Sequence, residues 1–246
     1  MKAEGNTPSA NDAAVRELYE RKADVYQQLG DAAGIREQLV LGLLPRRAAL
    51  RVLDVGCGSG RFLRILKQQG HQGVGVDVSE NAVAKARQSG VEACTADLNN
   101  GAGLESLPAP FDVITVLDAL EHTFDPAAVL RRLAGLLHSQ GSLIVSVPNI
   151  ACLAGRLTLL SGRFPLRDAG LFDSSHLRWF TLANLHHYAA GGGFRVAAVT
   201  GTPLPALRGC GLWRLDGAQT AILRPLARAW PGLWGYQLVA RLVRAA

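Results

Sequence analysis

Residues 52–60 read Val-Leu-Asp-Val-Gly-Cys-Gly-Ser-Gly, an apolar run that contains one acid and leads into three alternating glycines. The run predicts a buried strand, and the G-x-G-x-G turn predicts the start of a helix. Glycines let the backbone approach a ligand closely, and the free N–H groups at a helix start favour a carboxylate or phosphate. A dinucleotide fingerprint would need its third glycine one place later, where Arg61 stands, so the spacing argues against NAD.

The chain beyond this turn alternates between short β-branched runs and helical stretches. The predicted strands are Val52–Val55, Gly73–Val78, Val91–Ala96, Phe111–Leu117, Ser142–Val147, Phe194–Val199 and Tyr236–Val243. The predicted helices are Arg61–Gln69, Glu80–Gln88, Pro126–Leu137 and Thr181–Ala190, the last with Thr181 as its N-cap. Five strands separated by helices call for a parallel sheet covered on both faces, which makes the fold α/β and Rossmann-like.

Other segments flank or interrupt this alternation. They are an N-terminal helical cap at 1–50 with helices at 11–28 and 35–44, a lid insertion at about 149–180, and a helical insertion at about 204–233. The core is expected to span 51–246. The lid insertion is rich in Gly, Arg and Phe with poor periodicity, and we expect it to lie over the strand ends. The second insertion is expected to break at Pro225 and to stop at Pro231.

Acidic residues also end the next three predicted strands, at Asp77, Asp97 and Asp118. The carboxyl ends of parallel strands meet at one edge of a sheet, where ligands bind in open α/β folds. A carboxylate at Asp77 can accept hydrogen bonds from the vicinal hydroxyls of a ribose. One at Asp97 can accept from an adenine amino group while Leu98 covers the ring. Each acid also has a structural interpretation, because strand-end carboxylates cap helices and pair with arginines.

The order of these motifs, from about residue 51 to residue 149, resembles class I S-adenosylmethionine-dependent methyltransferases. The resemblance implies a seven-stranded, mostly parallel sheet with helices on both faces. It also implies S-adenosylmethionine as the methyl donor and S-adenosylhomocysteine as the product. The residues assigned to the donor are Asp54, Gly56, Cys57, Gly58, Gly60, Asp77, Val78, Asp97, Leu98, Leu117 and Asp118.

Two further stretches, 147–150 and 172–181, are similar to a bacterial branch that includes MetW-like and ubiquinone-type O-methyltransferases. The branch implies methyl transfer to a small-molecule acceptor in a biosynthetic pathway, with oxygen as the expected atom and nitrogen or carbon as alternatives. A MetW-like protein that binds or activates another enzyme is the rival from a different class. A dehydrogenase is a more distant rival.

Two histidines are candidates for the base that such a transfer can use. Methyl transfer from a sulfonium is an in-line displacement, and a hydroxyl or amine acceptor benefits from a base near neutral pKa. His122 follows the fourth strand, and His176 lies in the lid insertion. His122 could instead fix its loop, and His176 could be held by Asp173 or stack near Trp179. His186 and His187 are adjacent on a helix, so surface positions are expected for them.

Arginines are concentrated in two regions. Those of the lid insertion are Arg156, Arg163, Arg167 and Arg178, which could recognise an anionic group on the acceptor or simply be solvated. After Gly201 there are six arginines and one acid, Asp216, interleaved with Trp213, Trp230, Trp234 and Tyr236. We expect this segment to pack over the acceptor pocket, with contact to a membrane surface as the alternative. Nucleic acid is disfavoured, because no recognisable binding module accompanies the charge.

The composition fits one globular chain of 246 residues with 48% hydrophobic and 19% charged residues. Four cysteines without a C-x-x-C pair, and histidines without ligand spacing, suggest neither disulfides nor a metal site. The N-terminal residues lack an apolar signal region, and no stretch is long enough to span a bilayer. A cytoplasmic location is therefore expected.

Overall fold

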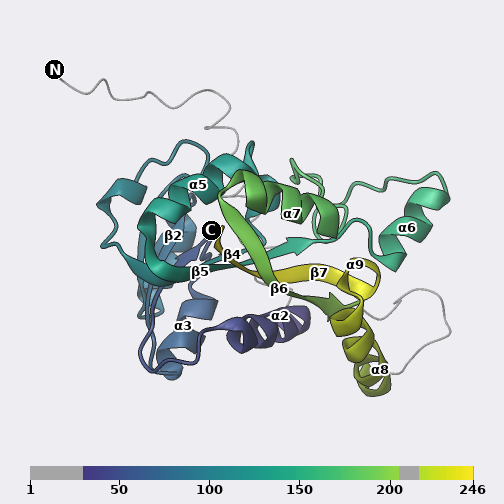
Figure 1. Cartoon of the computed structure of the whole chain (residues 1–246), viewed down its shortest axis with the longest axis horizontal. Helices are drawn as coiled ribbons and strands as arrows, with labels where there is room; N and C mark the ends of the chain where they lie inside the picture. The colour runs from purple at the N-terminus through teal and green to yellow at the C-terminus, as the bar shows by residue number, and fades with distance from the viewer. Residues whose placement is uncertain (1–29, 205–215, 246) are drawn as a thin grey trace.

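A computed structural model describes residues 30–204 and 216–245 of the chain. Its centre is one seven-stranded sheet in the order β3-β2-β1-β4-β5-β7-β6 (Figure 1). The strands are β1 Arg51–Val55, β2 Gln72–Asp77, β3 Glu92–Thr95, β4 Phe111–Leu117, β5 Leu137–Pro148, β6 Phe194–Pro203 and β7 Gly235–Arg244. Strands β1 to β5 run parallel, and β7 runs antiparallel to both β5 and β6. The expected seven-stranded, mostly parallel sheet is confirmed.

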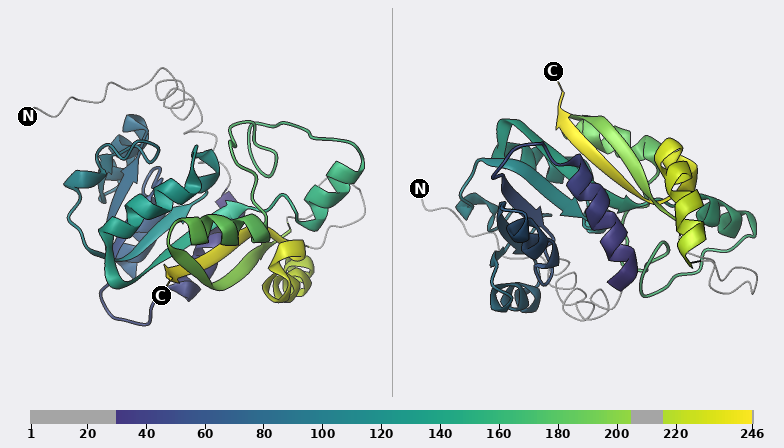
Figure 2. Two further views of the ribbon diagram at one scale, coloured as in Figure 1. Left: turned by 45° about the horizontal axis from the view of Figure 1, so that its top comes forward. Right: turned by 90° about the horizontal axis from the view of Figure 1, so that it is seen from below.

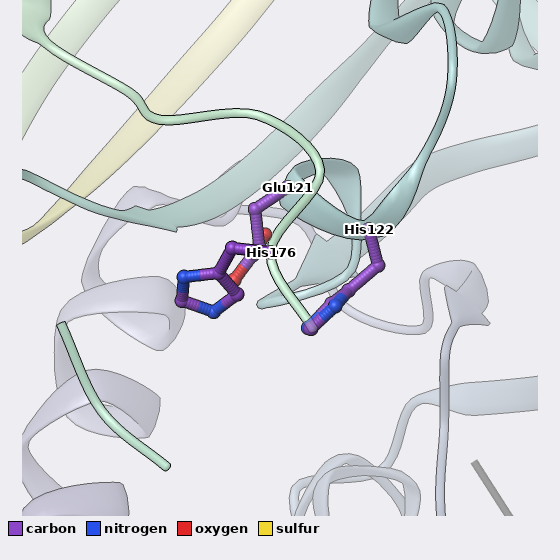
Figure 3. A group of neighbouring side chains, drawn as sticks. All are labelled: Glu121, His122 and His176. Atoms are coloured by element: carbon purple, nitrogen blue, oxygen red, sulfur yellow. The ribbon is translucent and has the colours of Figure 1, made fainter. Parts of the chain in front are cut away.

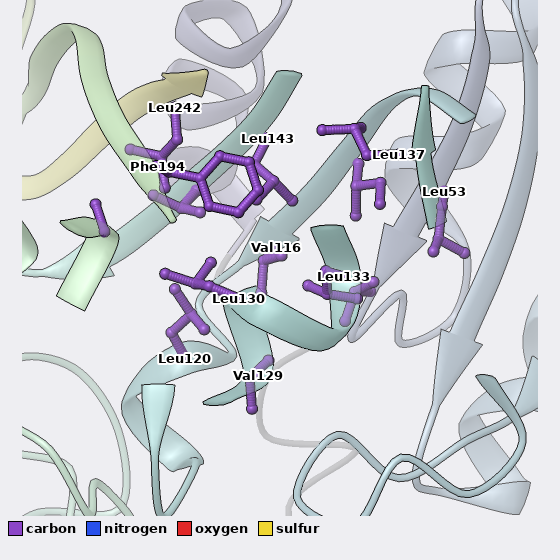
Figure 4. Close-up of a cluster of buried hydrophobic side chains, with 14 of the residues drawn as sticks. Leu53, Val116, Leu120, Val129, Leu130, Leu133, Leu137, Leu143, Phe194 and Leu242 are labelled. Carbon is purple, nitrogen blue, oxygen red and sulfur yellow. The ribbon is translucent and has the colours of Figure 1, made fainter. Parts of the chain in front are cut away.

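Helices cover both faces of this sheet (Figures 1 and 2). They are α2 Gly30–Leu43, α3 Arg61–Gln68, α4 Glu80–Gln88, α5 Pro126–Leu136, α6 Leu153–Leu160, α7 Leu182–Gly191, α8 Asp216–Ala229, α9 Pro231–Trp234, and the 3₁₀ turns η1 Leu104–Ser106 and η2 Leu120–His122. Successive side chains of a strand point to opposite faces. Leu53 and Val55 therefore pack with α5 and α7 in one core, shown in Figure 4, whereas Val52 packs with α2, α3 and α4 in the other.

Close packing of α3 on the sheet depends on glycine at one position of β2. A Cβ at Gly75 would lie 2.6 Å from Cys57 Sγ and 2.7 Å from Leu63 Cδ1. Only a residue without a side chain lets the helix and the turn before it come this close to the strand. The glycine turn at 56–60 is thereby seated directly against β2.

Most element boundaries agree with the pattern in the sequence to within one residue. Strand β6 continues to Pro203 rather than Val199, α2 begins at Gly30 rather than Ile35, and β5 and α8 differ as well. Strand β5 begins at Leu137 rather than Ser142, because Leu137 pairs with Phe111 before a register shift. Helix α8 continues through Pro225, so the predicted break is wrong. The missing N–H costs one helical hydrogen bond, and packing of α8 on β6 around the buried Ala227 offsets that loss. The predicted stop is confirmed, because α8 ends at Ala229 and Pro231 begins α9.

The N-terminal and lid predictions are partly covered by the described residues. The helix predicted at 35–44 is confirmed as α2, and the one predicted at 11–28 lies outside the described residues. The lid insertion contains α6 and long connections, and an isolated bridge joins its two ends, Asn149 and Phe180. Of the helices described, none combines the length and apolar character needed to cross a membrane.

Candidate functional site

The glycine turn lies at the carboxyl edge of β1 and is tied to β2. Gly56, Gly58 and Gly60 all have positive φ, at 74°, 51° and 75°. The amides of Gly56 and Cys57 donate to the carbonyl of Val76 at 2.8 and 3.0 Å. At Gly60 a Cβ would lie 2.6 Å from a methyl of Val91, so both the backbone angle and the space require glycine. Helix α3 starts after Gly60 with no side-chain cap.

Asp77 links this turn to the next one. Its Oδ2 accepts from the Gly58 amide at 2.9 Å, and its Oδ1 accepts from the Ser79 amide at 3.0 Å. The side chains of Asp77 and Val78 are half-buried. A carboxylate oxygen has two lone pairs, so each oxygen can accept a second bond from a ligand hydroxyl.

Asp97 organises the turn after β3. It is buried, and it accepts hydrogen bonds from the Asn99 amide at 2.8 Å and from Asn100 Nδ2 at 3.0 Å. Leu98 is partly buried against the first core. The carboxylate therefore has a structural role in its own turn, and a contact with adenine stays a prediction.

Asp54 lies beneath the turn rather than on its surface. Its side chain is buried, and its Oδ1 accepts a hydrogen bond from Thr115 Oγ1 at 2.7 Å. Burial raises the pKa of Asp54 from 3.8 to about 7, against the opposing effects of the Thr115 bond and of Arg36. Asp54 thus ties the end of β1, directly before the turn, to β4.

This pKa makes the stability of the protein depend on pH. As pH rises above about 4 the unfolded chain releases the Asp54 proton while the folded chain retains it until about pH 7. The unfolding free energy should therefore fall through this interval by a few kcal/mol, at about 1.4 kcal/mol per unit of pKa difference. In Asp54→Asn this fall in the unfolding free energy should vanish, because asparagine does not ionise. The side-chain oxygen of asparagine still accepts the Thr115 hydrogen bond. Urea unfolding at pH 4.5, 6 and 7.5 measures this, and parallel pH profiles for the two proteins would refute it.

Asp118 is the centre of a polar network that spans the sheet edge. Its φ of 52° is the only positive value among the non-glycine residues that the structure describes. Its carboxylate accepts from Ser146 Oγ at 2.7 Å and from Gln237 Nε2 at 2.7 Å, and it forms an ion pair with Arg36 of α2. Leu117, the residue before it, is buried in the second core. Asp118 therefore joins α2, β5 and β7 at the end of β4.

Two histidines, His122 and His176, lie close together with Glu121, as Figure 3 shows. The carbonyl of Glu121 in η2 accepts from the amides of Leu177 and Arg178 at 2.8 and 2.9 Å, which fixes the lid insertion on η2. The rings of His122 and His176 lie 5.0 Å apart in an edge-to-face arrangement. The two candidates that the sequence places 54 positions apart are therefore neighbours.

The two rings differ in their surroundings. His122 is buried, and its Nδ1 lies 3.1 Å from the carbonyl of Ser175. His176 is half-buried, and its ring packs edge-on against Trp179 at 5.3 Å. The alternative in which His176 lies against Trp179 agrees with this contact, which is edge-to-face rather than stacked.

Glu121 shares this cluster and was missed by the sequence interpretation. Its side chain is only 1% exposed, and neither carboxylate oxygen has a hydrogen-bond partner. Burial, reinforced by the charge of Asp118, raises its pKa well above the usual range of a glutamate. One ligand atom from each of Glu121, His122 and His176 lies within 4.8 Å of the others. Such a set can stabilise an imidazolium or hold a divalent cation, although the sequence alone suggested no metal site.

Comparison with known proteins agrees with the geometry of this edge. A family profile described as a methyltransferase domain matches residues 19–199. The chain belongs to the class I S-adenosylmethionine-dependent methyltransferases. The fold and the family expected from the motif order are both confirmed.

Relatives of this methyltransferase include two ubiquinone biosynthesis O-methyltransferases. The protein from Methylococcus capsulatus is 28% identical over 158 residues, which cover 63% of this chain and 67% of the relative. The protein from Xylella fastidiosa is 36% identical over 121 residues, which cover 48% of this chain and 49% of the relative, so this match spans only about half its length. A Thermotoga maritima structure described as a possible histamine N-methyltransferase superposes with a TM-score of 0.65 at 20% identity, covering 94% of this chain and 100% of that one. At that identity the superposition shows the fold alone.

Three of the four arginines in the lid insertion of this methyltransferase are exposed. Arg156, Arg163 and Arg167 are exposed, and Arg156 donates to the carbonyl of Ala151 at 2.6 Å. Arg178 is half-buried and donates to the carbonyls of Leu177 and Phe124. These positions favour the solvated interpretation over recognition of an anionic acceptor. His186 and His187 are exposed on α7, as expected.

Arg36 is the second residue that the sequence interpretation missed. The pattern of its helix identified an amphipathic element and gave no reason to expect a guanidinium in contact with Asp118, 82 positions away. The available signal was a charged pair, Arg36 and Glu37, shortly before the apolar stretch 39–44. Glu37 is buried and pairs with Arg61 at 3.2 Å.

Proposed function

We propose that this methyltransferase transfers the methyl group of S-adenosylmethionine to an oxygen atom of a small-molecule acceptor in a biosynthetic pathway. The observation that carries the proposal is the pair His122 and His176, held with Glu121 beside the glycine turn. Strands β1 and β4 are neighbours, with Val55 opposite Val116, so the turn after β1 and the turn after β4 share one edge. Donor and base would then lie side by side.

The donor would lie along the glycine turn. Asp77 would accept hydrogen bonds from the ribose hydroxyls, and Asp97 with Leu98 would frame the adenine. The uncapped start of α3 offers backbone N–H groups to the carboxylate of the methionine moiety. Gly56, Cys57, Gly58 and Gly60 would supply the close backbone approach. Asp54 would tie the strand before the turn to β4, and Asp118 would tie the end of β4 to α2, β5 and β7.

The acceptor proton would go to His176. As the acceptor oxygen bonds to the methyl carbon, the carbon–sulfur bond breaks and S-adenosylhomocysteine leaves, while the hydroxyl proton moves to the imidazole. His176 is the better candidate of the two because it is half-buried, whereas His122 is buried and fixed on Ser175. Burial favours the neutral acid of Glu121, and the positive charge that forms on the imidazole would lower that raised pKa, so the carboxylate and the imidazolium would stabilise each other as the proton moves.

Ligand-dependent melting tests this proposal. S-adenosylhomocysteine at about 100 times its Kd should stabilise the folded state by about 2.7 kcal/mol and raise the melting temperature by roughly 5–10 °C. NAD at the same concentration should leave the melting temperature unchanged.

Tritiated donor should then label at least one member of a panel of phenols, aliphatic alcohols and amines. Binding without labelling, together with a stoichiometric co-purifying protein, would favour the MetW-like rival. Labelling confined to amines would refute the choice of oxygen.

The location and partners of the protein are part of the same proposal. A cytoplasmic location is supported by the free thiols of Cys57, Cys94 and Cys152, since thiols persist in a reducing compartment. The acceptor is the expected partner. Contact of the basic C-terminal segment with a membrane surface is supported by the exposed Ile222 and Trp230 on and beside α8.

A further inference from the structure

Exposed apolar side chains gather in two segments of the chain. Ten large hydrophobic residues are exposed in the part that the structure describes, and eight of them fall between 157 and 166 or between 222 and 230. They are Leu157, Leu159, Leu160, Phe164, Leu166, Ile222, Leu226 and Trp230. Leu160 is 84% exposed and Ile222 is 66% exposed, so neither contributes to the core. Burying such side chains away from water is favourable wherever a surface is available.

The two segments project from the same end of the molecule. In Figures 1 and 2, α6 and α8 both extend beyond the end of the sheet where β7 meets α9, on the side away from β3. We call the exposed residues of 156–167 and 222–230 the apolar end. It includes α8, which lies outside the region matched by the family profile.

The charges of the apolar end are of one sign. Arg156 and Arg167 flank the first segment and Arg163 lies within it, and Arg224 and Arg228 lie within the second; all five are exposed. No Asp or Glu occurs from 149 to 167 or from 217 to 246, and Asp168 follows directly after the first segment. Exposed leucines and aromatics interleaved with arginines are the composition that binds the interface of an anionic bilayer.

We propose that the apolar end docks on the surface of an anionic lipid bilayer. Leu157, Leu160 and Leu166 from one segment and Ile222 and Trp230 from the other would enter the headgroup region. The arginines would neutralise lipid phosphates. Two separate projecting elements suit a fluid surface, which adapts to each of them, better than a partner of fixed shape. The association would be peripheral, since no described helix is able to span the bilayer.

Vesicle flotation of the full-length protein tests the proposal. The probes are phosphatidylcholine vesicles with about 40% phosphatidylglycerol, and pure phosphatidylcholine vesicles, both at low salt. The wild-type protein should float with the anionic vesicles, and Leu160→Glu/Ile222→Glu and Arg163→Glu/Arg228→Glu should each weaken that binding at least tenfold. The matched controls, Phe124→Ser for an exposed apolar residue and Arg46→Glu for an exposed arginine, lie outside the apolar end and should float like wild type.

Several outcomes would overturn this proposal. Wild-type protein that stays with the soluble fraction would do so, as would double variants that float like wild type or controls that lose binding equally. A wild-type dimer that becomes monomeric in Leu160→Glu/Ile222→Glu, without vesicle binding, would assign the apolar end to a second copy instead. Melting temperatures equal to wild type show that the variants are folded, and substitution at such exposed positions is expected to preserve them.

Discussion

Replacing His176 with alanine is expected to lower the turnover number about 10²–10³-fold while leaving the affinity for S-adenosylhomocysteine within about twofold. The imidazole would take the acceptor proton as the methyl group transfers, so its loss affects the chemical step. The contacts proposed for the donor are made by the glycine turn and Asp77 rather than by His176, so donor affinity should be retained. Turnover is measured with tritiated donor and the best acceptor of the panel, and donor affinity by calorimetry.

The matched control for this variant is His186→Ala, an exposed histidine on α7. It should retain wild-type turnover. His122→Ala is expected to have a smaller effect than His176→Ala, since His122 is fixed on Ser175. If both His122→Ala and His176→Ala keep full turnover while binding donor, neither histidine is the base.

Chelation separates two roles for the same cluster. If Glu121, His122 and His176 act through proton transfer alone, the turnover of wild-type protein is unaffected by excess EDTA. If they hold a divalent cation that positions the acceptor oxygen, EDTA abolishes turnover and added Mg²⁺ or Mn²⁺ restores it. The second result would contradict the assignment of His176 as the general base.

Asp77→Ala is expected to weaken binding of S-adenosylhomocysteine about 100-fold. Each hydrogen bond to a charged group is worth about 1.5–3 kcal/mol, and the variant loses the contacts proposed for the ribose. It also releases the amides of Gly58 and Ser79, which Asp77 holds at 2.9 and 3.0 Å, so the turn loses its preorganised shape. Calorimetry with the purified variant measures the change in Kd.

Asp112→Ala is the matched control for this second variant. Asp112 lies near the start of β4, at the opposite edge of the sheet, where it accepts from the Arg51 amide at 2.9 Å and pairs with Arg47 at 3.2 Å. The Asp112→Ala variant loses a set of contacts comparable to that lost in Asp77→Ala, and its affinity for S-adenosylhomocysteine should be unchanged. A Kd for Asp77→Ala equal to that of Asp112→Ala would remove Asp77 from the donor site.

Several features followed from sequence because they depend on local pattern. The apolar run and the glycines at 52–60 specify a strand, a turn with positive φ and a helix start within nine residues. Alternating β-branched runs and amphipathic stretches then specify parallel strands covered by helices. The strand-end acids follow directly, because the carboxyl ends of parallel strands share one edge of the sheet. The capping box of Thr181 and Asn184 at the start of α7 is equally local.

The remaining features depend on side chains that are distant in sequence. Asp118 contacts Arg36 across 82 positions and Gln237 across 119, and no periodicity encodes such pairs. Glu121 lies beside His176 only because the lid insertion folds back onto η2, which contains Glu121. Pro225 remains inside α8 because tertiary packing outweighs the loss of one helical hydrogen bond. Local sequence thus determined the sheet, its carboxyl edge and the glycine turn. Long-range packing decided which charged groups meet at that edge and which apolar side chains stay exposed to water.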